Sequence, residues 1–113
     1  MKKPLIIAHR GASGLAPENT LAAFRRAIAD GAEGIEFDVR LAKDGAPVVF
    51  HDATLRRLSD RKNLVSSLTT EELQQIDVGA WFNRRKTNPS NEDFSGERIP
   101  TLAGLLEFLK DFK

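Results

Sequence analysis

The distribution of apolar and polar residues predicts a strand, a loop and a helix in the first part of the chain. Residues 5–8 form a short apolar run followed at once by a glycine-rich turn, which is typical of a buried strand. Apolar positions then recur at helical spacing between Pro17 and Asp30, and Gly31 follows as a stop signal. This order of elements indicates an α/β fold.

A second strand is predicted where the helical period gives way to alternation. Apolar and polar side chains alternate across residues 35–41, which predicts one strand with an apolar and a polar face. Asp44 and Gly45 separate this strand from the apolar segment 48–50, and Asp-Gly in this setting is the strongest short-range signal for a β-hairpin. We therefore expect residues 35–50 to form a hairpin.

The register of this hairpin decides which side chains share a face. With a two-residue turn, Asp38 is expected opposite His51, and the apolar residues of the two strands share the other face. A bulged three-residue loop would turn the apolar set of one strand onto the polar face. The pattern therefore favours the two-residue turn, with Glu36, Asp38 and His51 together on the polar face.

Residues 51–99 lose this periodicity and are expected to form a long, loop-rich excursion. A capping-box pattern at Thr69 and Glu72 predicts one short helix within it. Trp81 and Phe82 are expected to pack the excursion onto the body of the domain.

The last segment predicts an amphipathic helix that begins at Pro100 and Thr101. Its apolar residues recur at helical spacing and form one stripe. They are Leu102, Leu105, Leu106, Leu109 and Phe112.

Composition excludes several classes of protein. A chain of 113 residues with 41% apolar and 29% charged residues is typical of one small globular domain. Seventeen basic against 16 acidic residues give a net charge of +1, which offers no general attraction for nucleic acid or anionic lipid. The absence of cysteine excludes a disulfide framework and fits a reducing compartment, so we expect a cytoplasmic location. No apolar run is long enough to predict a membrane span.

Glu36 and Asp38 are candidate metal ligands, because they lie two positions apart on the polar strand face, about 7 Å apart at Cα. Both can reach one cation, and two carboxylates with water are a usual partial shell for Mg²⁺ or Ca²⁺. An isolated pair of this spacing is more often a solvated strand face with Arg40 as ion-pair partner. The spacing alone leaves both interpretations open.

His9 and His51 are the side chains best suited to proton transfer near neutral pH, since the chain has no cysteine or tyrosine. His9 and Arg10 follow the first strand, where ligand sites of α/β sheets form, and the planar fork of the arginine can bind phosphate. Taken singly, each also fits a structural role, as a hydrogen-bonded histidine or as a packing and salt-bridge pair.

Six separated segments of the chain, taken in order, closely resemble the glycerophosphodiester phosphodiesterases. They are His9-Arg10-Gly11, PENT at Pro17–Thr20, GIEFDV at Gly34–Val39, KDG at Lys43–Gly45, VVFHD at Val48–Asp52 and IPTL at Ile99–Leu102. Several motifs in one order make the resemblance specific, unlike any one of them alone.

The resemblance implies the N-terminal part of a TIM-type (β/α)₈ barrel that hydrolyses glycerophosphodiesters to glycerol 3-phosphate and an alcohol. It also implies a divalent cation, Mg²⁺ or Ca²⁺. By this resemblance His9 and His51 look like the acid/base pair. Glu36 and Asp38 look like metal ligands, and Arg10 looks like a phosphate contact.

The resemblance further implies that residues 1–113 are one partial barrel, with an insertion at about 52–98 that shapes the mouth of the site. A full barrel takes about 250 residues, so the chain carries less than half of one. The family's third metal-ligating glutamate is expected on a strand that follows the last helix. Two interpretations follow. In the first, the chain is a catalytic phosphodiesterase or a piece of one, and the isolated 113 residues are expected to be inactive. In the second, the chain is a non-catalytic fragment that folds or associates without turnover. The PENT segment argues against a sphingomyelinase-like phospholipase.

A partial barrel leaves strand edges and helix faces without partners, so we expect the chain to self-associate through them. We also expect the apolar stripe of the last helix to stay exposed or to be buried against another copy of the chain. The expected partner is a small-molecule glycerophosphodiester, with no nucleic acid. Arg56, Arg57 and Lys62 could guide such an anion, although basic residues of this kind more often form a solvated surface.

Overall fold

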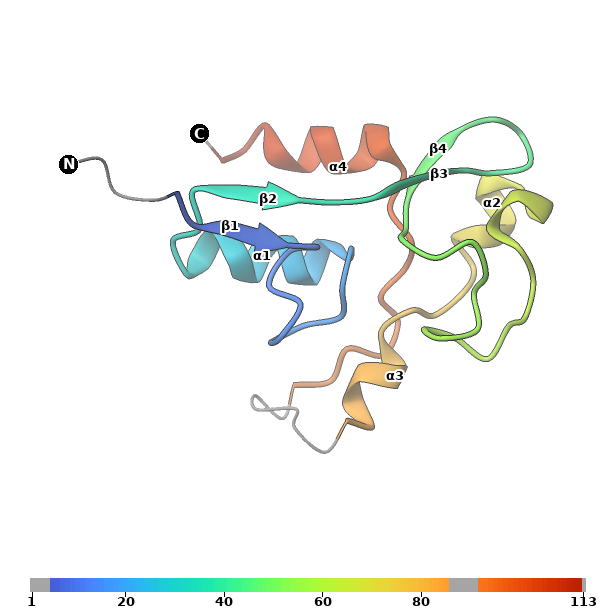
Figure 1. Ribbon diagram of the computed structural model, residues 1–113, viewed down its shortest axis with the longest axis horizontal. Coiled ribbons are helices and arrows are strands. Elements are labelled where there is room, and N and C mark those ends of the chain that lie inside the picture. Colours follow the sequence, from blue (N-terminus) through green and yellow to red (C-terminus); the bar gives the residue numbers. More distant parts are fainter. Residues whose placement is uncertain (1–4, 86–91, 113) are drawn as a thin grey trace.

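Figure 1 shows two small two-stranded sheets with helices packed around them. The computed structural model describes residues 5–85 and 92–112. The elements are β1 (Ile7–His9), α1 (Leu21–Ala29), β2 (Gly34–Glu36), β3 (Val39–Leu41), β4 (Pro47–Val49), the 3₁₀ turn η1 (Val65–Ser67), α2 (Thr70–Leu73), α3 (Ala80–Asn83) and α4 (Leu102–Leu109). β1 and β2 pair in parallel across α1, and β3 and β4 pair antiparallel, which gives the predicted α/β architecture. In the part of the chain that is described, no helix has the length and hydropathy needed to cross a bilayer.

Local signals set the bounds of α1, as predicted. The Thr20 hydroxyl accepts a hydrogen bond from the Ala23 N–H at 3.2 Å and donates one to the Pro17 carbonyl at 2.7 Å. Gly31 follows the helix with a φ of +84°, a left-handed conformation that glycine adopts without steric cost. The inward face of α1 then buries Phe24 completely.

β1 is exposed, which corrects the prediction of a buried strand at residues 5–8. The side chains of Leu5, Ile6 and Ile7 are 69%, 62% and 53% exposed. β2 pairs with one edge of β1, and no second strand pairs with it in the described part of the chain. The apolar run therefore presents an uncovered strand edge.

The strand predicted over residues 35–41 is interrupted at Phe37 and Asp38, where the chain leaves one sheet and enters the other. Phe37 packs edge-to-face on Phe24, with ring centroids 6.3 Å apart. The Asp38 carbonyl accepts a hydrogen bond from the Phe50 N–H at 2.9 Å. The two halves of the expected strand therefore belong to different sheets.

The β3–β4 hairpin differs by one residue from the predicted register. Val39 pairs with Val49, one position earlier than a two-residue turn requires. Ala42 donates its N–H to the Ala46 carbonyl at 3.0 Å across the base of a three-residue loop, in which Gly45 has a φ of +82°. This is the bulged loop, with glycine at the left-handed position.

Burial of β4 on both faces explains this register. Val48, Val49 and Phe50 are each at most 2% exposed, so both faces of this segment are apolar. Alternation of apolar and polar residues therefore cannot indicate which register the hairpin adopts. Val39 and Leu41 are 45% and 60% exposed, and the apolar face expected for their strand is therefore not buried. The prediction that the pattern selects a two-residue turn is wrong.

The excursion after β4 has an apolar core of its own. Thr69 and Glu72 form the predicted capping box at the start of α2. Phe82 in α3 is fully buried, with its ring 5.5 Å from that of Trp81 and 5.4 Å from that of Phe94. The same cluster includes residues of α1, so the packing role predicted for Trp81 and Phe82 is confirmed. The single turn η1 has no side-chain cap, whereas Asp77 accepts hydrogen bonds from the Gly79 and Ala80 N–H groups at the start of α3, a local signal that sequence reasoning missed.

Gly79 is needed where the start of α3 approaches the last part of the excursion. A Cβ at this position would lie 2.0 Å from the Phe94 carbonyl oxygen and 2.8 Å from the Glu97 Cβ. We expect Gly79→Ala to lower the free energy of unfolding by about 1–3 kcal/mol, the usual cost of overpacking. Gly14→Ala is the matched control, because nothing lies within 4 Å of its Cβ position. Equal denaturation midpoints for the two variants would contradict this prediction.

α4 is only partly exposed, which corrects the expectation for its apolar stripe. Leu105 is fully buried in one cluster with Phe24 and Val49, so α1, β4 and α4 share this core. Leu106 is 52% exposed, and Phe112, which lies beyond the end of the helix, is 41% exposed. The chain thus covers one side of the stripe itself.

Candidate functional site

The carboxyl ends of β1 and β2 bring the first pair of candidate residues together. Parallel pairing sets His9 beside Glu36, and the His9 Nε2 lies 3.4 Å from the Glu36 Oε2. Glu36 Oε1 is buried and has no hydrogen-bond partner among the described residues. A carboxylate with an unused acceptor oxygen can take a proton donor or a cation.

Asp38 is held by two side chains from the loop between β1 and α1. The Asn19 Nδ2 donates to the Asp38 Oδ2 at 3.1 Å, and the Arg10 Nε lies 3.4 Å from the same oxygen. Asn19 and Arg10 have φ values of +57° and +54°, and the Asn19 N–H donates to the Arg10 carbonyl at 2.9 Å. The loop thus keeps both residues in the left-handed region, which is uncommon for residues other than glycine and is often found at functional sites.

Glu18 is a buried carboxylate that sequence reasoning missed as a site residue. It is 7% exposed and accepts a hydrogen bond from the Arg10 Nη1 at 3.1 Å. It also accepts two from Arg57, at 2.8 Å and 2.9 Å. Glu18 belongs to the PENT segment, but its arginine partner lies 39 residues further on, and no spacing rule could have joined them.

His51 is held by the residue that follows it. The His51 Nδ1 lies 2.6 Å from the Asp52 Oδ1, and Arg57 donates to both oxygens of Asp52 at 2.9 Å and 3.0 Å. The hydrogen bonds from Arg57, and then the contact with His51, hold the pKa of Asp52 well below its ordinary value. Hydrogen bonds to Glu18 and then to Asp52 raise the pKa of Arg57 further above neutrality. Asp52 is therefore ionised at neutral pH.

The hairpin does not place His51 opposite Asp38, which corrects the predicted register of the site. Phe50 occupies that position instead, with its N–H on the Asp38 carbonyl. Arg40, the ion-pair partner considered for the carboxylates, donates from Nε to the His51 carbonyl at 2.9 Å. Arg10 is the cation beside Asp38. The link from His51 to the first loop therefore runs through side chains after β4 rather than through hairpin pairing.

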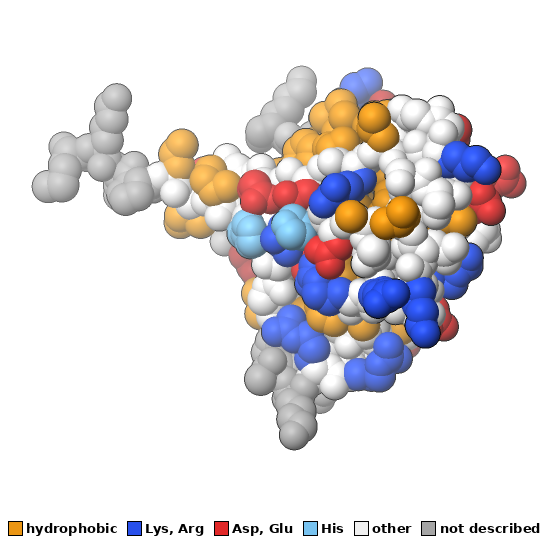
Figure 2. Space-filling view, turned by 45° about the vertical axis from the view of Figure 1, so that its right-hand side comes forward, with side chains coloured by type: hydrophobic (Ala, Val, Ile, Leu, Met, Phe, Trp, Pro, Cys, Tyr) orange, Lys and Arg blue, Asp and Glu red, His pale blue; other side chains and the backbone are white. Residues whose placement is uncertain are grey.

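Figure 2 shows the two histidine side chains of the chain side by side on one face, with acidic and basic side chains around them. The side chain of His9 is 63% exposed and that of His51 is 42% exposed. Each imidazole is therefore accessible to a ligand that approaches from solvent.

The donor set fits part of a divalent-cation shell. Within residues 5–85 and 92–112, no group of three or more His, Cys, Asp or Glu side chains is arranged to hold a metal ion. Glu36 and Asp38 supply two carboxylates, and the unused Glu36 Oε1 is a suitable oxygen ligand. Such oxygen donors suit Mg²⁺ or Ca²⁺.

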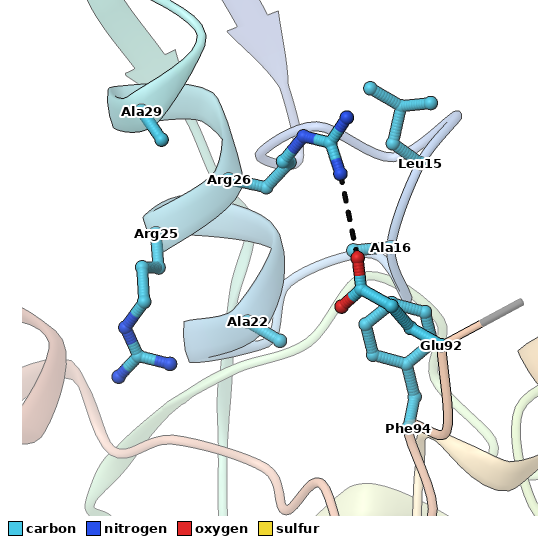
Figure 3. A pocket seen from close by; sticks show the side chains of 8 residues that line it. All are labelled: Leu15, Ala16, Ala22, Arg25, Arg26, Ala29, Glu92 and Phe94. Carbon is cyan, nitrogen blue, oxygen red and sulfur yellow. Dashed lines mark ion pairs between the residues drawn. The ribbon is translucent and has the colours of Figure 1, made fainter. Parts of the chain in front are cut away.

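A separate cavity of about 260 Å³ lies along α1, and Figure 3 shows the ion pair across it between Arg26 and Glu92, whose Nη1 and Oε1 are 3.6 Å apart. None of the five candidate residues lines this cavity. Its lining residues are Leu15, Ala16, Ala22, Arg25, Arg26, Ala29, Glu92 and Phe94.

The chain is similar in sequence to several curated phosphodiesterases. The glycerophosphodiester phosphodiesterase of Caldanaerobacter subterraneus subsp. tengcongensis is 48% identical over 109 residues, which are 96% of this chain and 42% of the relative. Human glycerophosphodiester phosphodiesterase 1 is 46% identical over 96 residues, which are 85% of this chain and 27% of the relative. The chain thus spans less than half the length of these relatives.

Solved structures show the same relationship. A phosphodiesterase of Oleispira antarctica, solved in complex with the product sn-glycerol-3-phosphate, matches 96% of this chain and 40% of its own with a TM-score of 0.82 and 41% identity. A glycerophosphodiester phosphodiesterase of Agrobacterium tumefaciens matches 96% of this chain and 44% of its own with a TM-score of 0.84 and 38% identity. The model of the glycerophosphoryl diester phosphodiesterase family matches residues 9–113. The resemblance seen in the six motifs is thereby confirmed, and the chain belongs to the glycerophosphoryl diester phosphodiesterase family.

Proposed function

We propose that this chain is the N-terminal part of a TIM-type barrel enzyme that hydrolyses glycerophosphodiesters to glycerol 3-phosphate and an alcohol. The observation that carries the proposal is the pairing of His9 with Glu36 at the carboxyl ends of two parallel strands, where barrel enzymes have their active sites. The similarity to a phosphodiesterase solved with sn-glycerol-3-phosphate supports the substrate class.

In the proposed reaction, the bond between phosphorus and the alcohol oxygen breaks as a bond from the attacking oxygen to phosphorus forms. One of His9 and His51 accepts the proton of the attacking oxygen, and the other donates a proton to the departing alcohol oxygen, so the protons balance. Arg10 offers its guanidinium to the nonbridging phosphate oxygens. Glu18 holds that guanidinium in place through its Nη1.

Glu36 and Asp38 are the residues that would hold a divalent cation in the proposed enzyme. A bound cation would neutralise charge on the nonbridging oxygens of the phosphodiester. Two carboxylates leave the rest of the shell to water or to residues outside this chain.

A non-catalytic fragment is the second candidate. The exposed apolar strand β1 and the absence of a three-ligand cluster among the described residues favour it. The two proposals differ in one measurable property. Only the first predicts that the chain, joined to the rest of a family member's barrel, hydrolyses a glycerophosphodiester.

The test is a chimera in which this chain replaces the matching 42% of the Caldanaerobacter relative. We expect the chimera to hydrolyse glycerophosphocholine with Mg²⁺ or Ca²⁺ and to lose activity in EDTA. A folded but inactive chimera would favour the non-catalytic fragment, and full activity in EDTA would refute the metal role.

Glu36→Ala in the chimera tests the metal-binding assignment separately. It is expected to raise the cation concentration needed for half-maximal rate by at least about 10–100-fold, because that is the cost of losing even an outer-shell partner of a metal ligand. Glu107→Ala is the control, because this exposed glutamate in α4 pairs only with Lys110 among the described residues. Equal cation requirements of the two variants would remove Glu36 from the site.

A further inference from the structure

The imidazole of His51 has one nitrogen engaged and one available. Its Nδ1 lies 2.6 Å from the Asp52 Oδ1, and no hydrogen bond of its Nε2 is formed within the described part of the chain. The carboxylate of Asp52 is ionised and can only accept hydrogen bonds. The Nδ1 must therefore carry the proton of the neutral ring, which leaves the Nε2 lone pair for a substrate.

Arg57 holds this carboxylate through a two-point contact. Its Nε donates to the Asp52 Oδ2 at 2.9 Å and its Nη2 to the Asp52 Oδ1 at 3.0 Å. The Oδ1 atom accepts hydrogen bonds from both Arg57 and His51. The orientation of the guanidinium therefore fixes the position of the atom that orients the imidazole.

Glu18 fixes the other side of Arg57. Two hydrogen bonds of 2.8 Å and 2.9 Å join the Arg57 guanidinium to the Glu18 carboxylate, which is 7% exposed. All three guanidinium nitrogens are thus engaged between two carboxylates. A lysine has one charged nitrogen and cannot reproduce this planar geometry. The Arg57 side chain is 46% exposed, but its guanidinium is held between two carboxylates rather than left free in solvent.

Glu18 also holds Arg10, the candidate phosphate contact, through a hydrogen bond of 3.1 Å. A single buried carboxylate is thus shared by two arginines, one leading to the phosphate side of the site and the other to His51. The network is continuous from Arg10 through Glu18, Arg57 and Asp52 to His51.

We propose that Arg57 and Glu18 are positioning residues, which hold the His51 imidazole with Nδ1 protonated and Nε2 free to contact the substrate. Through Glu18 they also fix the position of this imidazole relative to the Arg10 guanidinium. This inference rests on the proposed acid/base role of His51. Its geometric part, the protonation of Nδ1, is measurable whether or not the chain turns over substrate.

The first test is nitrogen-15 NMR of the chimera labelled at histidine. The signals that disappear in its His51→Gln variant are those of His51. We expect the neutral His51 ring to be mainly the Nδ1–H tautomer, the reverse of the preference of free imidazole side chains. A predominant Nε2–H tautomer in the unsubstituted chimera overturns the proposal, and this measurement needs no substitution at a buried contact.

Substitution of Arg57 tests its role in the same spectra. Arg57→Gln is expected to lower the fraction of the Nδ1–H tautomer of His51 at least twofold, and Arg57→Lys is expected to restore it only partly. Arg26→Gln is the matched control, because the Arg26 Nε also donates to a carboxylate oxygen at 2.9 Å, that of Asp30. An unchanged His51 tautomer in Arg57→Gln overturns the positioning role of Arg57.

The second test measures kinetics in the chimera. Arg57→Gln is expected to lower kcat about tenfold or more and to shift the pH profile of kcat, with a smaller change in KM, as loss of a group that orients a catalytic histidine does. Glu18→Gln should alter kcat and KM together, since it also releases Arg10. An Arg57→Gln chimera with the parent pH profile and kcat overturns the proposal. An inactive parent chimera with the expected tautomer counts against the proposed function alone and supports the hydrogen-bonded network.

Discussion

Replacing His9 or His51 by alanine in the chimera is expected to lower kcat by about 10²–10⁴-fold, the usual loss when a general acid or base is removed. Each imidazole has a carboxylate beside it, Glu36 at 3.4 Å from His9 and Asp52 at 2.6 Å from His51. Both side chains are partly exposed, so alanine removes little buried surface. Turnover of glycerophosphocholine and the thermal midpoint of each variant are the measurements.

The double variant His9→Ala/His51→Ala separates a shared reaction step from two independent structural roles. Residues that act in one step lose activity non-additively, so the double variant should be little slower than the poorer single variant. Losses that multiply, with lowered thermal midpoints, would indicate structural damage instead. Parent-like kcat in either single variant would remove that histidine from the acid/base assignment.

The isolated 113-residue chain is expected to self-associate and to be at least about 10²-fold less active than the chimera, because small displacements of reacting groups cost this much. The self-association is attributed to the uncovered strand β1 and the two residues before it, because Leu5, Ile6 and Ile7 are 69%, 62% and 53% exposed. An unpaired apolar strand edge is a template for pairing with another chain. Sedimentation velocity over a range of concentrations measures the association.

The double variant Leu5→Lys/Ile6→Lys should shift the isolated chain toward the monomer, since charge on a strand edge opposes pairing. Leu64→Lys is the control, because Leu64 is 50% exposed but lies in the excursion, away from β1. A monomeric parent chain with turnover equal to that of the chimera would refute the prediction. Equal effects of the two sets of substitutions would assign the association to general hydrophobicity.

Features that close within a few residues were predictable from the sequence. The Thr20 cap and the left-handed Gly31 bound α1, and Thr69 with Glu72 bounds α2. Each of these depends on a hydrogen bond or a backbone conformation that a short segment decides by itself. The family was also predictable, because its motifs follow one another in order along the chain.

The hairpin register depended on contacts that come from distant parts of the chain. Val49 is buried against Phe24 and Leu105, whereas Val48 and Phe50 are buried in the core of the excursion. A strand covered on both faces carries no alternation, so the pattern of β4 is equally compatible with both registers. The position of His51 relative to Asp38 therefore could not be predicted from the pattern of the hairpin.

The candidate site shows the same division. Residue types and strand ends were sufficient to name His9, Arg10, Glu36, Asp38 and His51, and parallel pairing does set His9 beside Glu36. The roles of Glu18 and Arg57 depend on an ion pair across 39 residues, formed only when the loop before α1 meets the loop after β4. Sequence spacing describes neighbours along one element, whereas this ion pair between the buried Glu18 and the partly exposed Arg57 forms only when the fold brings the two loops together. Tertiary structure alone therefore determined which arginine holds Asp52, the partner of His51, and which carboxylate joins that arginine to Arg10.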